Sequence, residues 1–233
     1  MCIAILNRNS NPVSKEYFEN SLYNNADGFG MAWAENGQVK TFKSLSNNPN
    51  KLYKQYLKRF EKTSLPMLLH FRISTSGLID LANCHPFHVS NRLAFIHNGI
   101  ISGLGNQLEN DTRHFNRIYL KHIQENDILG NSAIQSLLSD RIGYSKLVFL
   151  NGDGETSIIN SKLGIEETDG NWYSNSTYSY GSCDYWYPKA KKWDNWEDSE
   201  VYTKCGGCDG MSNCSFDSVY KMYLCKECKE WIK

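Results

Sequence analysis

The sequence predicts an α+β fold, because strands come first, then helices, then strands again. This order differs from the regular strand–helix alternation of a parallel doubly wound sheet. Hydrophobic residues make up 40% of the 233 residues and charged residues 21%, which is typical of a globular chain that can bury a full core. We expect one main layered domain followed by a small appendage.

The first third of the chain is predicted to hold four strands and two helices. Short apolar runs predict the strands, and Asn36-Gly37 is a strong signal for the turn of a hairpin. Apolar residues at helical spacing predict the helices, the first of which Ser14 can cap. The strands are expected at residues 2–6, 28–34, 38–42 and 66–73. The helices are expected at residues 14–23 and 50–62.

The remainder of the main domain follows the same two patterns. A second hairpin is predicted around Asn151-Gly152-Asp153-Gly154. Strands are expected at residues 92–96, 146–150, 155–160 and 172–180. Helices are expected at residues 111–124 and 132–138.

The charge balance gives no sign of a nucleic-acid or membrane partner. Lys+Arg and Asp+Glu number 25 each, so nothing global indicates binding to nucleic acid or to a membrane. We find no basic segment followed by an apolar signal region at the N-terminus, and no apolar run long enough to span a bilayer. The expected location is therefore the cytoplasm, where the 8 cysteines would be thiols or metal ligands and not disulfides.

Cysteine follows the initiator methionine directly. Removal of Met1 would leave Cys2 with both a thiol and a free α-amine, which are a nucleophile and a base on one residue. The alternative is a half-buried cysteine at the start of an ordinary strand.

Four further segments and one aspartate carry polar groups suited to chemistry. The segments are residues 25–30, 70–77, 84–87 and 97–101, and the aspartate is Asp111. Each has a plain alternative. Asp-Gly and Asn-Gly are common turn dipeptides, an arginine after a strand is usually at the surface, and Asp111 has the position of a helix N-cap.

One reaction accounts for these segments together, namely attack of an N-terminal thiol on an amide. Such a reaction needs an oxyanion hole, which Asn98 can supply through its side-chain amide and Gly99 through its backbone N–H. An amino-acid substrate also presents a carboxylate, which suits Arg72, and an ammonium group, which suits Asp111.

The order and wording of these motifs resemble the class II glutamine amidotransferase domain, an N-terminal-nucleophile (Ntn) hydrolase. The resemblance runs from Cys2 to about residue 180. It is carried by that cysteine, by His-x-Arg-x-x-Thr-x-Gly at 70–77, by His-Asn-Gly-Ile-Ile at 97–101 and by the stretch 169–176. It implies a four-layer αββα Ntn-hydrolase sandwich with the thiol exposed at a sheet edge.

The resemblance also implies a reaction and a role for each residue. Glutamine would be hydrolysed to glutamate and ammonia through a γ-glutamyl thioester on Cys2, with the α-amine as base and no catalytic cofactor. Asn98 and Gly99 would form the oxyanion hole, Arg72 would hold the substrate carboxylate, and Asp111 its α-ammonium. Supporting positions in the glutamine pocket are Thr75 and Ser76. No role as a base falls on His70, His85 and His97, which are expected to be structural.

The chain departs from the family pattern in two places. It has Cys2-Ile3-Ala4 where many members have Cys-Gly-Ile, and the stretch 25–28 lacks the arginine of an Arg-Gly-x-Asp-Gly segment. An enzyme without that arginine is expected to be slow by itself or to need a partner.

About 50 residues follow the domain, too few for a fused synthase. We therefore favour a subunit that passes ammonia to a separate synthetase partner. The alternatives are a free-standing glutaminase or related amidohydrolase, and a catalytically weak or inactive interaction module, associated with protein or nucleic acid, that acts through the tail.

The tail predicts a structural zinc site. The expected domains are 2–181 for the amidotransferase, 182–204 for an aromatic, Lys-rich linker and 205–233 for a zinc-ribbon-like module. Two C-x2-C pairs lie 16 residues apart, within the ~15–20 typical of zinc ribbons. The ligands would be Cys205, Cys208, Cys225 and Cys228. Cys214 is an alternative ligand, and unrelated or redox-paired cysteines are the alternative interpretation.

The tail has no basic footprint. The last 50 residues carry eight lysines against nine acidic residues, so docking onto a partner protein is favoured over nucleic-acid binding. Two of the cysteines outside the pairs, Cys84 and Cys183, are expected to be plain thiols.

Overall fold

The computed structural model describes residues 2–8, 10–179, 201–204, 211–217 and 222–226. Contacts divide the chain into two compact units, Met1–Asp184 and Tyr185–Lys233. Every site residue predicted between positions 2 and 111 therefore belongs to the first unit.

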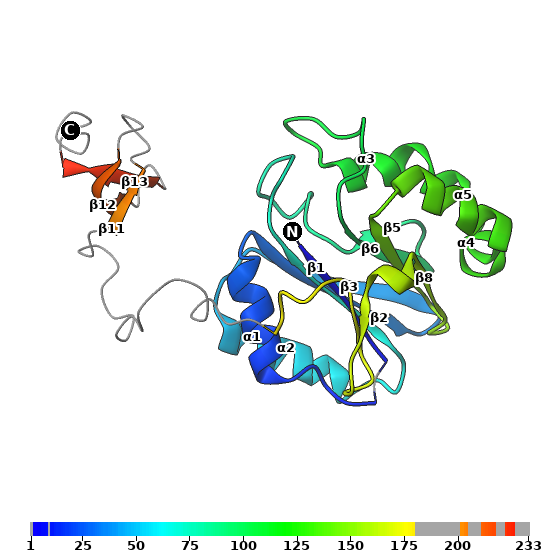
Figure 1. The fold of residues 1–233 in the computed structure, drawn as a ribbon. Coiled ribbons are helices and arrows are strands. Elements are labelled where there is room, and N and C mark those ends of the chain that lie inside the picture. Colours follow the sequence, from blue (N-terminus) through cyan, green and yellow to red (C-terminus); the bar gives the residue numbers. More distant parts are fainter. Residues whose placement is uncertain (1, 9, 180–200, 205–210, 218–221, 227–233) are drawn as a thin grey trace. The chain divides into compact units, whose positions relative to one another are not determined.

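Two antiparallel sheets form the first unit (Figure 1). The larger has the order β3-β2-β4-β1-β10-β9 and the smaller the order β5-β6-β7-β8. The strands of the larger sheet are β1 (Ile3–Asn7), β2 (Gly28–Glu35), β3 (Gln38–Ser44), β4 (Met67–Arg72), β9 (Ile165–Glu166) and β10 (Trp172–Tyr173). Those of the smaller sheet are β5 (Phe87–His88), β6 (Leu93–Asn98), β7 (Lys146–Asn151) and β8 (Thr156–Ile159).

Five α-helices begin at polar or capped positions. They are α1 (Lys15–Asn24), α2 (Pro49–Phe60), α3 (Asp111–Ile118), α4 (Glu125–Gly130) and α5 (Ser132–Ile142). Two short 3-10 helices are Leu120–His122 and Ser161–Leu163. Ser14 caps α1 as predicted, since its hydroxyl accepts the N–H of Tyr17 at 3.1 Å. Asn48 caps α2, whose first residue is a proline, a residue favoured at that position.

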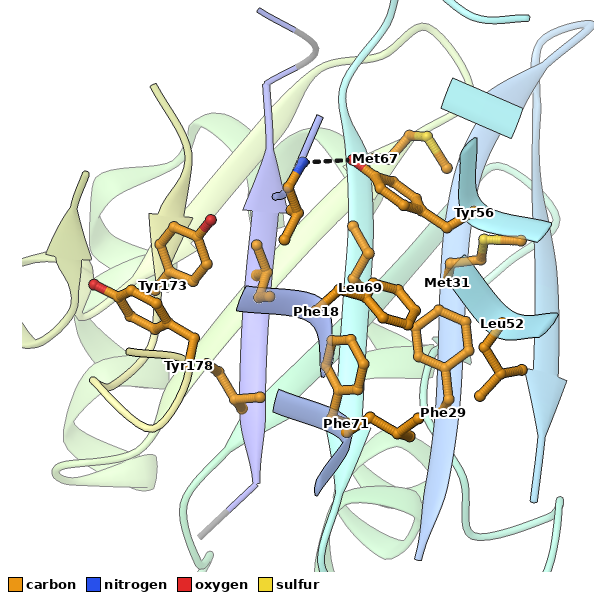
Figure 2. Close-up of a cluster of buried hydrophobic side chains, with 14 of the residues drawn as sticks. Phe18, Phe29, Met31, Leu52, Tyr56, Met67, Leu69, Phe71, Tyr173 and Tyr178 are labelled. Carbon is orange, nitrogen blue, oxygen red and sulfur yellow. Dashed lines mark hydrogen bonds between the residues drawn. The ribbon is translucent and has the colours of Figure 1, made fainter. Parts of the chain in front are cut away.

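The first hydrophobic cluster lies between the larger sheet and helices α1 and α2 (Figure 2). Phe18 of α1 is fully buried, and its ring centroid lies 4.9 Å from that of Phe71 and 5.2 Å from that of Phe29. Tyr56 of α2 joins the same cluster. These aromatic contacts hold the two helices against β2 and β4.

A second cluster lies between the two sheets and a third lies under α3, α4 and α5. Small side chains such as Ala4 and Ala94 belong to the second, and Phe115 and Phe149 to the third. Because neighbouring side chains of a strand point to opposite faces, Ile3 faces the helices while Ala4 faces the other sheet. β1 is thus buried on both faces, which explains its continuous apolar sequence. The predicted mixture of helices and sheets is confirmed.

Two predicted elements are wrong in extent. The helix expected at 111–124 ends at Ile118, because Leu120 and Ile128 both enter the third cluster and the chain must turn between them. The strand expected at 172–180 pairs only over Trp172–Tyr173, after which Asn175 forms a turn with the N–H of Thr177 at 3.0 Å.

The second unit contains a three-stranded antiparallel sheet of β11 (Val201–Lys204), β12 (Met211–Asp217) and β13 (Met222–Cys225). Its register places Cys214 opposite Cys225. The other predicted zinc ligands, Cys205, Cys208 and Cys228, lie outside the described residues, as does Cys183. Among the residues that are described, no cluster of three or more metal-binding side chains occurs. Within the same part of the chain, no helix is long and apolar enough to cross a membrane.

Candidate active site

The thiol of Cys2 lies at a cavity of about 20 Å³ where the two sheets and the start of α3 meet. Its lining includes six of the seven site residues predicted in this unit: Cys2, Arg72, Thr75, Ser76, Gly99 and Asp111. The seventh, Asn98, does not line this cavity. The other lining residues are Ile73, His85, His97, Asn110 and Thr112.

The backbone of Cys2 is anchored while its side chain faces the cavity. Its carbonyl oxygen accepts hydrogen bonds from the side-chain amides of Asn98 and Asn175. The sulfur lies 3.3 Å from both the backbone nitrogen and the carbonyl oxygen of Ile73. Burial raises the pKa of the thiol, opposed by the Ile73 N–H and the positive charge of Arg72. The thiol therefore needs a base to become a good nucleophile.

The side chain of Asn98 is hydrogen-bonded to the backbone of Cys2. Asn98 ends β6, is 1% exposed and donates through its Nδ2 to the Cys2 carbonyl. It lines a neighbouring cleft of about 500 Å³ together with Gly99 and Lys146. One N–H of the amide is thus engaged and the second remains to serve as a donor.

Gly99 lies where no side chain fits. Its φ is +137°, and a Cβ built there would lie 2.1 Å from the hydroxyl oxygen of Ser145. Only glycine meets both conditions, so residue 99 lines the cavity without a side chain.

Gly99→Ala is expected to lower the free energy of unfolding by about 2–4 kcal/mol, because overpacking adds to the strain of the backbone. Gly103→Ala is the matched control. Gly103 also has positive φ (+77°), but a Cβ placed on it would have nothing within 4 Å. Urea denaturation of both variants measures the difference. Equal losses would mean that Ser145 does not exclude a side chain.

Arg72 is a buried cation without a carboxylate partner. It ends β4 and is 2% exposed. Three of its N–H groups donate within the loop that follows, to the carbonyls of Leu78 (3.0 Å) and Ser76 (3.1 Å) and the hydroxyl of Ser74 (3.1 Å). None of the ion pairs in the described part of the chain involves Arg72. A buried guanidinium held only by neutral groups favours an anion beside it.

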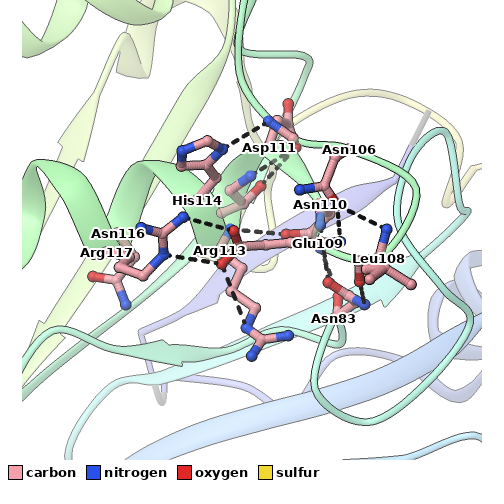
Figure 3. Close-up of polar contacts among 12 residues, drawn as sticks. Asn83, Asn106, Leu108, Glu109, Asn110, Asp111, Arg113, His114, Asn116 and Arg117 are labelled. Atoms are coloured by element: carbon pink, nitrogen blue, oxygen red, sulfur yellow. Dashed lines mark hydrogen bonds and ion pairs between the residues drawn. The ribbon is translucent and has the colours of Figure 1, made fainter.

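Asp111 is the first residue of α3 and not its cap. The cap is Asn110, whose side chain accepts the N–H of Arg113 at 2.8 Å. Figure 3 shows how Asn83 fixes this start: it accepts the backbone N–H of Asn110 at 2.9 Å, and its carbonyl accepts the Asn110 amide at 2.8 Å. The Asp111 carboxylate accepts the backbone N–H of Ile101 at 2.6 Å. It thereby ties the helix to the loop that begins at Gly99.

Three buried histidines lie close together, and two of them, His85 and His97, line the cavity. The ring centroids of His70 and His85 are 3.9 Å apart, and those of His85 and His97 are 6.4 Å apart. Burial lowers the pKa of His70 to about 3 and that of His97 to about 4, and that of His85 falls well below its ordinary value. At neutral pH all three rings are uncharged.

Sequence reasoning missed several residues of the cavity. Asn175 lies 173 positions from Cys2, and only the resemblance of the stretch 169–176 pointed to it. His85 and His97 were predicted to be structural, yet both line the cavity. Asp27 was interpreted as a turn residue, and its carboxylate accepts the N–H of Ser74 at 2.7 Å, holding the loop that follows Arg72.

Two sequence comparisons give the same family. Residues 18–117 match the family model described as class II glutamine amidotransferases. Over 107 residues, the chain is 34% identical to the probable glutamine amidotransferase DUG3 of Saccharomyces cerevisiae (strain ATCC 204508 / S288c). Both matches therefore point to similarity with class II glutamine amidotransferases, and each covers less than half of this chain. The DUG3 match covers 43% of this chain and 29% of that protein.

Two solved structures are also similar. A class II glutamine aminotransferase domain protein from Silicibacter pomeroyi has 16% identity and a TM-score of 0.40, over 74% of this chain and 87% of that one. Glutamine phosphoribosylpyrophosphate amidotransferase from B. subtilis has 14% identity and a TM-score of 0.43, over 74% and 41%. The family match includes the positions from Arg72 to Asp111 and begins after Cys2.

Proposed function

We propose that this protein is a glutaminase that hydrolyses L-glutamine to glutamate and ammonia on Cys2. The observation that carries the proposal is the shared cavity of a thiol, a buried cation and a carboxylate. Arg72 offers a guanidinium that has no ion-pair partner among the described residues, and Asp111 offers a negative charge at the same cavity. These charges complement the α-carboxylate and α-ammonium of a free amino acid.

The reaction would begin when the Cys2 sulfur attacks the side-chain carbonyl carbon of glutamine. The α-amine left by removal of Met1 would take the thiol proton and pass it to the leaving nitrogen, which departs as ammonia. Negative charge on the carbonyl oxygen would be stabilised by the Gly99 N–H and the second N–H of Asn98. A γ-glutamyl thioester would remain, and water would release glutamate from it.

The layered architecture supports the same proposal. We propose that α1 and α2, the two sheets, and α3 to α5 are the four layers of an Ntn-hydrolase sandwich. The three hydrophobic clusters between successive layers support this. Cys2 immediately precedes β1, an interior strand of the larger sheet, so the nucleophile would stand at the end of that strand.

The ammonia acceptor and the tail belong to the proposal as well. We propose that a separate cytoplasmic synthetase subunit uses the ammonia, since free release would waste it. The tail, residues 205–233, would bind structural zinc through the two C-x2-C pairs and dock onto that partner. Its support is the spacing of Cys205, Cys208, Cys225 and Cys228 in the sequence.

Asn98→Ala is expected to lower kcat for glutamine by about 10²–10³, because one oxyanion donor is lost. The KM should change little, since the charged ends of the substrate are bound elsewhere. Steady-state kinetics with a glutamate assay measure both constants. Asn175→Ala is the control, because it removes the other amide from the same Cys2 carbonyl. If both variants lose kcat equally, Asn98 only anchors Cys2 and does not serve the oxyanion.

Glutamate release from glutamine by the purified protein tests the function itself. The intact mass of the same sample establishes whether Met1 has been removed. Release of glutamate and ammonia in equal amounts, with asparagine as a poor substrate, is expected. A chain that begins at Cys2 and releases neither product would refute a self-sufficient glutaminase.

A further inference from the structure

The stacked histidines present ring nitrogens that have no partner. His70, His85 and His97 are each at most 3% exposed. Within the described residues, Nδ1 of His70, Nε2 of His97 and both ring nitrogens of His85 are buried without a hydrogen bond. A buried polar atom left unsatisfied costs about 1–3 kcal/mol, so such a group of atoms indicates a bound polar molecule.

Hydrogen bonds fix where two of these rings carry their protons. Nε2 of His70 lies 2.9 Å from the carbonyl oxygen of His97, which only accepts, so this nitrogen carries the hydrogen. The Thr112 hydroxyl lies 3.2 Å from an Asp111 carboxylate oxygen and 2.7 Å from Nδ1 of His97; we assign its hydrogen to the carboxylate, so that Nδ1 of His97 donates to the hydroxyl. The free nitrogens, Nδ1 of His70 and Nε2 of His97, are consequently lone-pair acceptors. Each of these two nitrogens can accept a hydrogen bond from a bound donor.

The cavity that His85 and His97 share with Cys2 has room for such a donor. Its volume of about 20 Å³ exceeds the roughly 10–15 Å³ of probe volume that one water needs. The rings are uncharged at neutral pH, so they do not repel a polar neutral molecule or attract an anion.

We infer that His85 and His97 hold the water molecule that hydrolyses the thioester on Cys2. This inference rests on the proposed glutaminase function and adds a role for residues expected to be structural. The water would enter where ammonia has left, and would donate one hydrogen to an imidazole lone pair. His85 and His97 are then positioning residues for the second half of the reaction.

The hydrolytic step balances without a further reactant. The oxygen of the held water adds to the thioester carbon, and its other proton passes to the α-amine of Cys2. The carbon–sulfur bond then breaks, and the departing sulfur takes that proton back as a thiol. Glutamate leaves as the γ-carboxylic acid, which releases its remaining proton to bulk water and becomes a carboxylate, and the histidines finish the cycle neutral.

His85→Phe tests this role, because phenylalanine keeps an aromatic ring against His70 and Phe87 and removes both nitrogens. Steady-state glutamate release is expected to fall by roughly 10- to 100-fold, since a misplaced reactant costs rate of this order. Acid-quenched intact mass should show γ-glutamyl enzyme accumulating above the wild-type level. Hydroxylamine, which attacks the thioester in place of water, should restore turnover as γ-glutamylhydroxamate.

Two further variants keep the test decisive. His85→Gln retains polar atoms and should recover part of the lost rate. His88→Phe makes the same change at an exposed histidine of β5 and should behave as wild type. An unchanged rate in His85→Phe overturns the inference. The inference is also overturned if a folded His85→Phe variant loses acylation and hydrolysis equally. Failure of hydroxylamine to restore turnover overturns it as well. Failure of the glutaminase proposal looks different, because the wild-type protein would then form no adduct.

Discussion

Replacing Cys2 with alanine is expected to lower glutamine hydrolysis by about 10⁴–10⁶-fold, because no other residue that lines the cavity carries a thiol. The fold should remain intact. The thiol makes only the two 3.3 Å contacts with Ile73, and the anchoring bonds of residue 2 use its backbone carbonyl. Glutamate release and thermal unfolding of the same preparation measure the two expectations together.

Cys84→Ala is the matched control for this experiment. Cys84 is fully buried, and its thiol lies 3.5 Å from the carbonyl oxygen of Phe29. Burial raises the pKa of that thiol to about 11, so it is not a nucleophile at neutral pH. The variant should retain the wild-type rate. Substantial activity in Cys2→Ala, or an equal loss in Cys84→Ala, would contradict the assignment of the nucleophile.

The chemistry of Cys2 depends on its α-amine as much as on its sulfur. Burial makes the thiol harder to ionise, and no histidine nitrogen is hydrogen-bonded to the sulfur among the described residues. An adjacent amine with a pKa near ~8 is therefore the simplest base for the proposed reaction. A chain that retains Met1 would keep the thiol but lose this base. Comparing the two N-terminal forms separates the contributions of sulfur and amine.

Several predicted site residues stand at strand ends that the structure brings to one cavity, while their roles stay predictions. β1 pairs with β4 so that Ile3 lies opposite Phe71, which brings Cys2 beside Arg72 although they are 70 positions apart. Recognising β1 and β4 in the sequence was enough to expect site residues at their ends. It was not enough to predict that the two strands pair with each other. The antiparallel register is a long-range property, and it emerges only when the strands are assembled.

The sequence could not show which way individual side chains point or how deeply they are buried. The role of Asn98 in the oxyanion hole stays a prediction, and the hydrogen bond from its amide to the Cys2 carbonyl could not be predicted from the sequence. The histidines belong to motifs that were noticed, yet their stacking requires β4, β6 and the loop before β5 to converge. The helix from 111 was predicted too long because its apolar period continues beyond Ile118, where packing of Leu120 ends it.

Arg72→Met is expected to raise the KM for glutamine by on the order of 10²-fold or more, because removing one partner of a buried charge pair costs about 2–5 kcal/mol. Methionine fills much of the volume of arginine but has no charge and no N–H donors. The kcat should fall less than the KM rises, since the acyl chemistry occurs at the other end of the substrate. Steady-state kinetics over a wide range of glutamine concentrations resolve the two constants.

Structural damage is the main competing explanation, because Arg72 also binds the carbonyls of Ser76 and Leu78. Arg8→Met is a control for loss of a cation, since Arg8 forms an exposed ion pair with Glu166 at 2.6 Å and should leave the kinetics unchanged. Arg72→Lys restores the charge without the planar fork and should give an intermediate KM.

A second substrate separates recognition from support of the loop. Glutaminamide has an amide in place of the α-carboxylate, so the wild-type enzyme should bind it far less well than glutamine. If Arg72 pairs with the carboxylate, Arg72→Met will lose affinity for glutamine and hardly any for glutaminamide, and the preference will disappear. If Arg72 only holds the loop after β4, both substrates will suffer equally and the preference will persist. The ratio of the two KM values therefore decides what this buried, unpaired guanidinium is for.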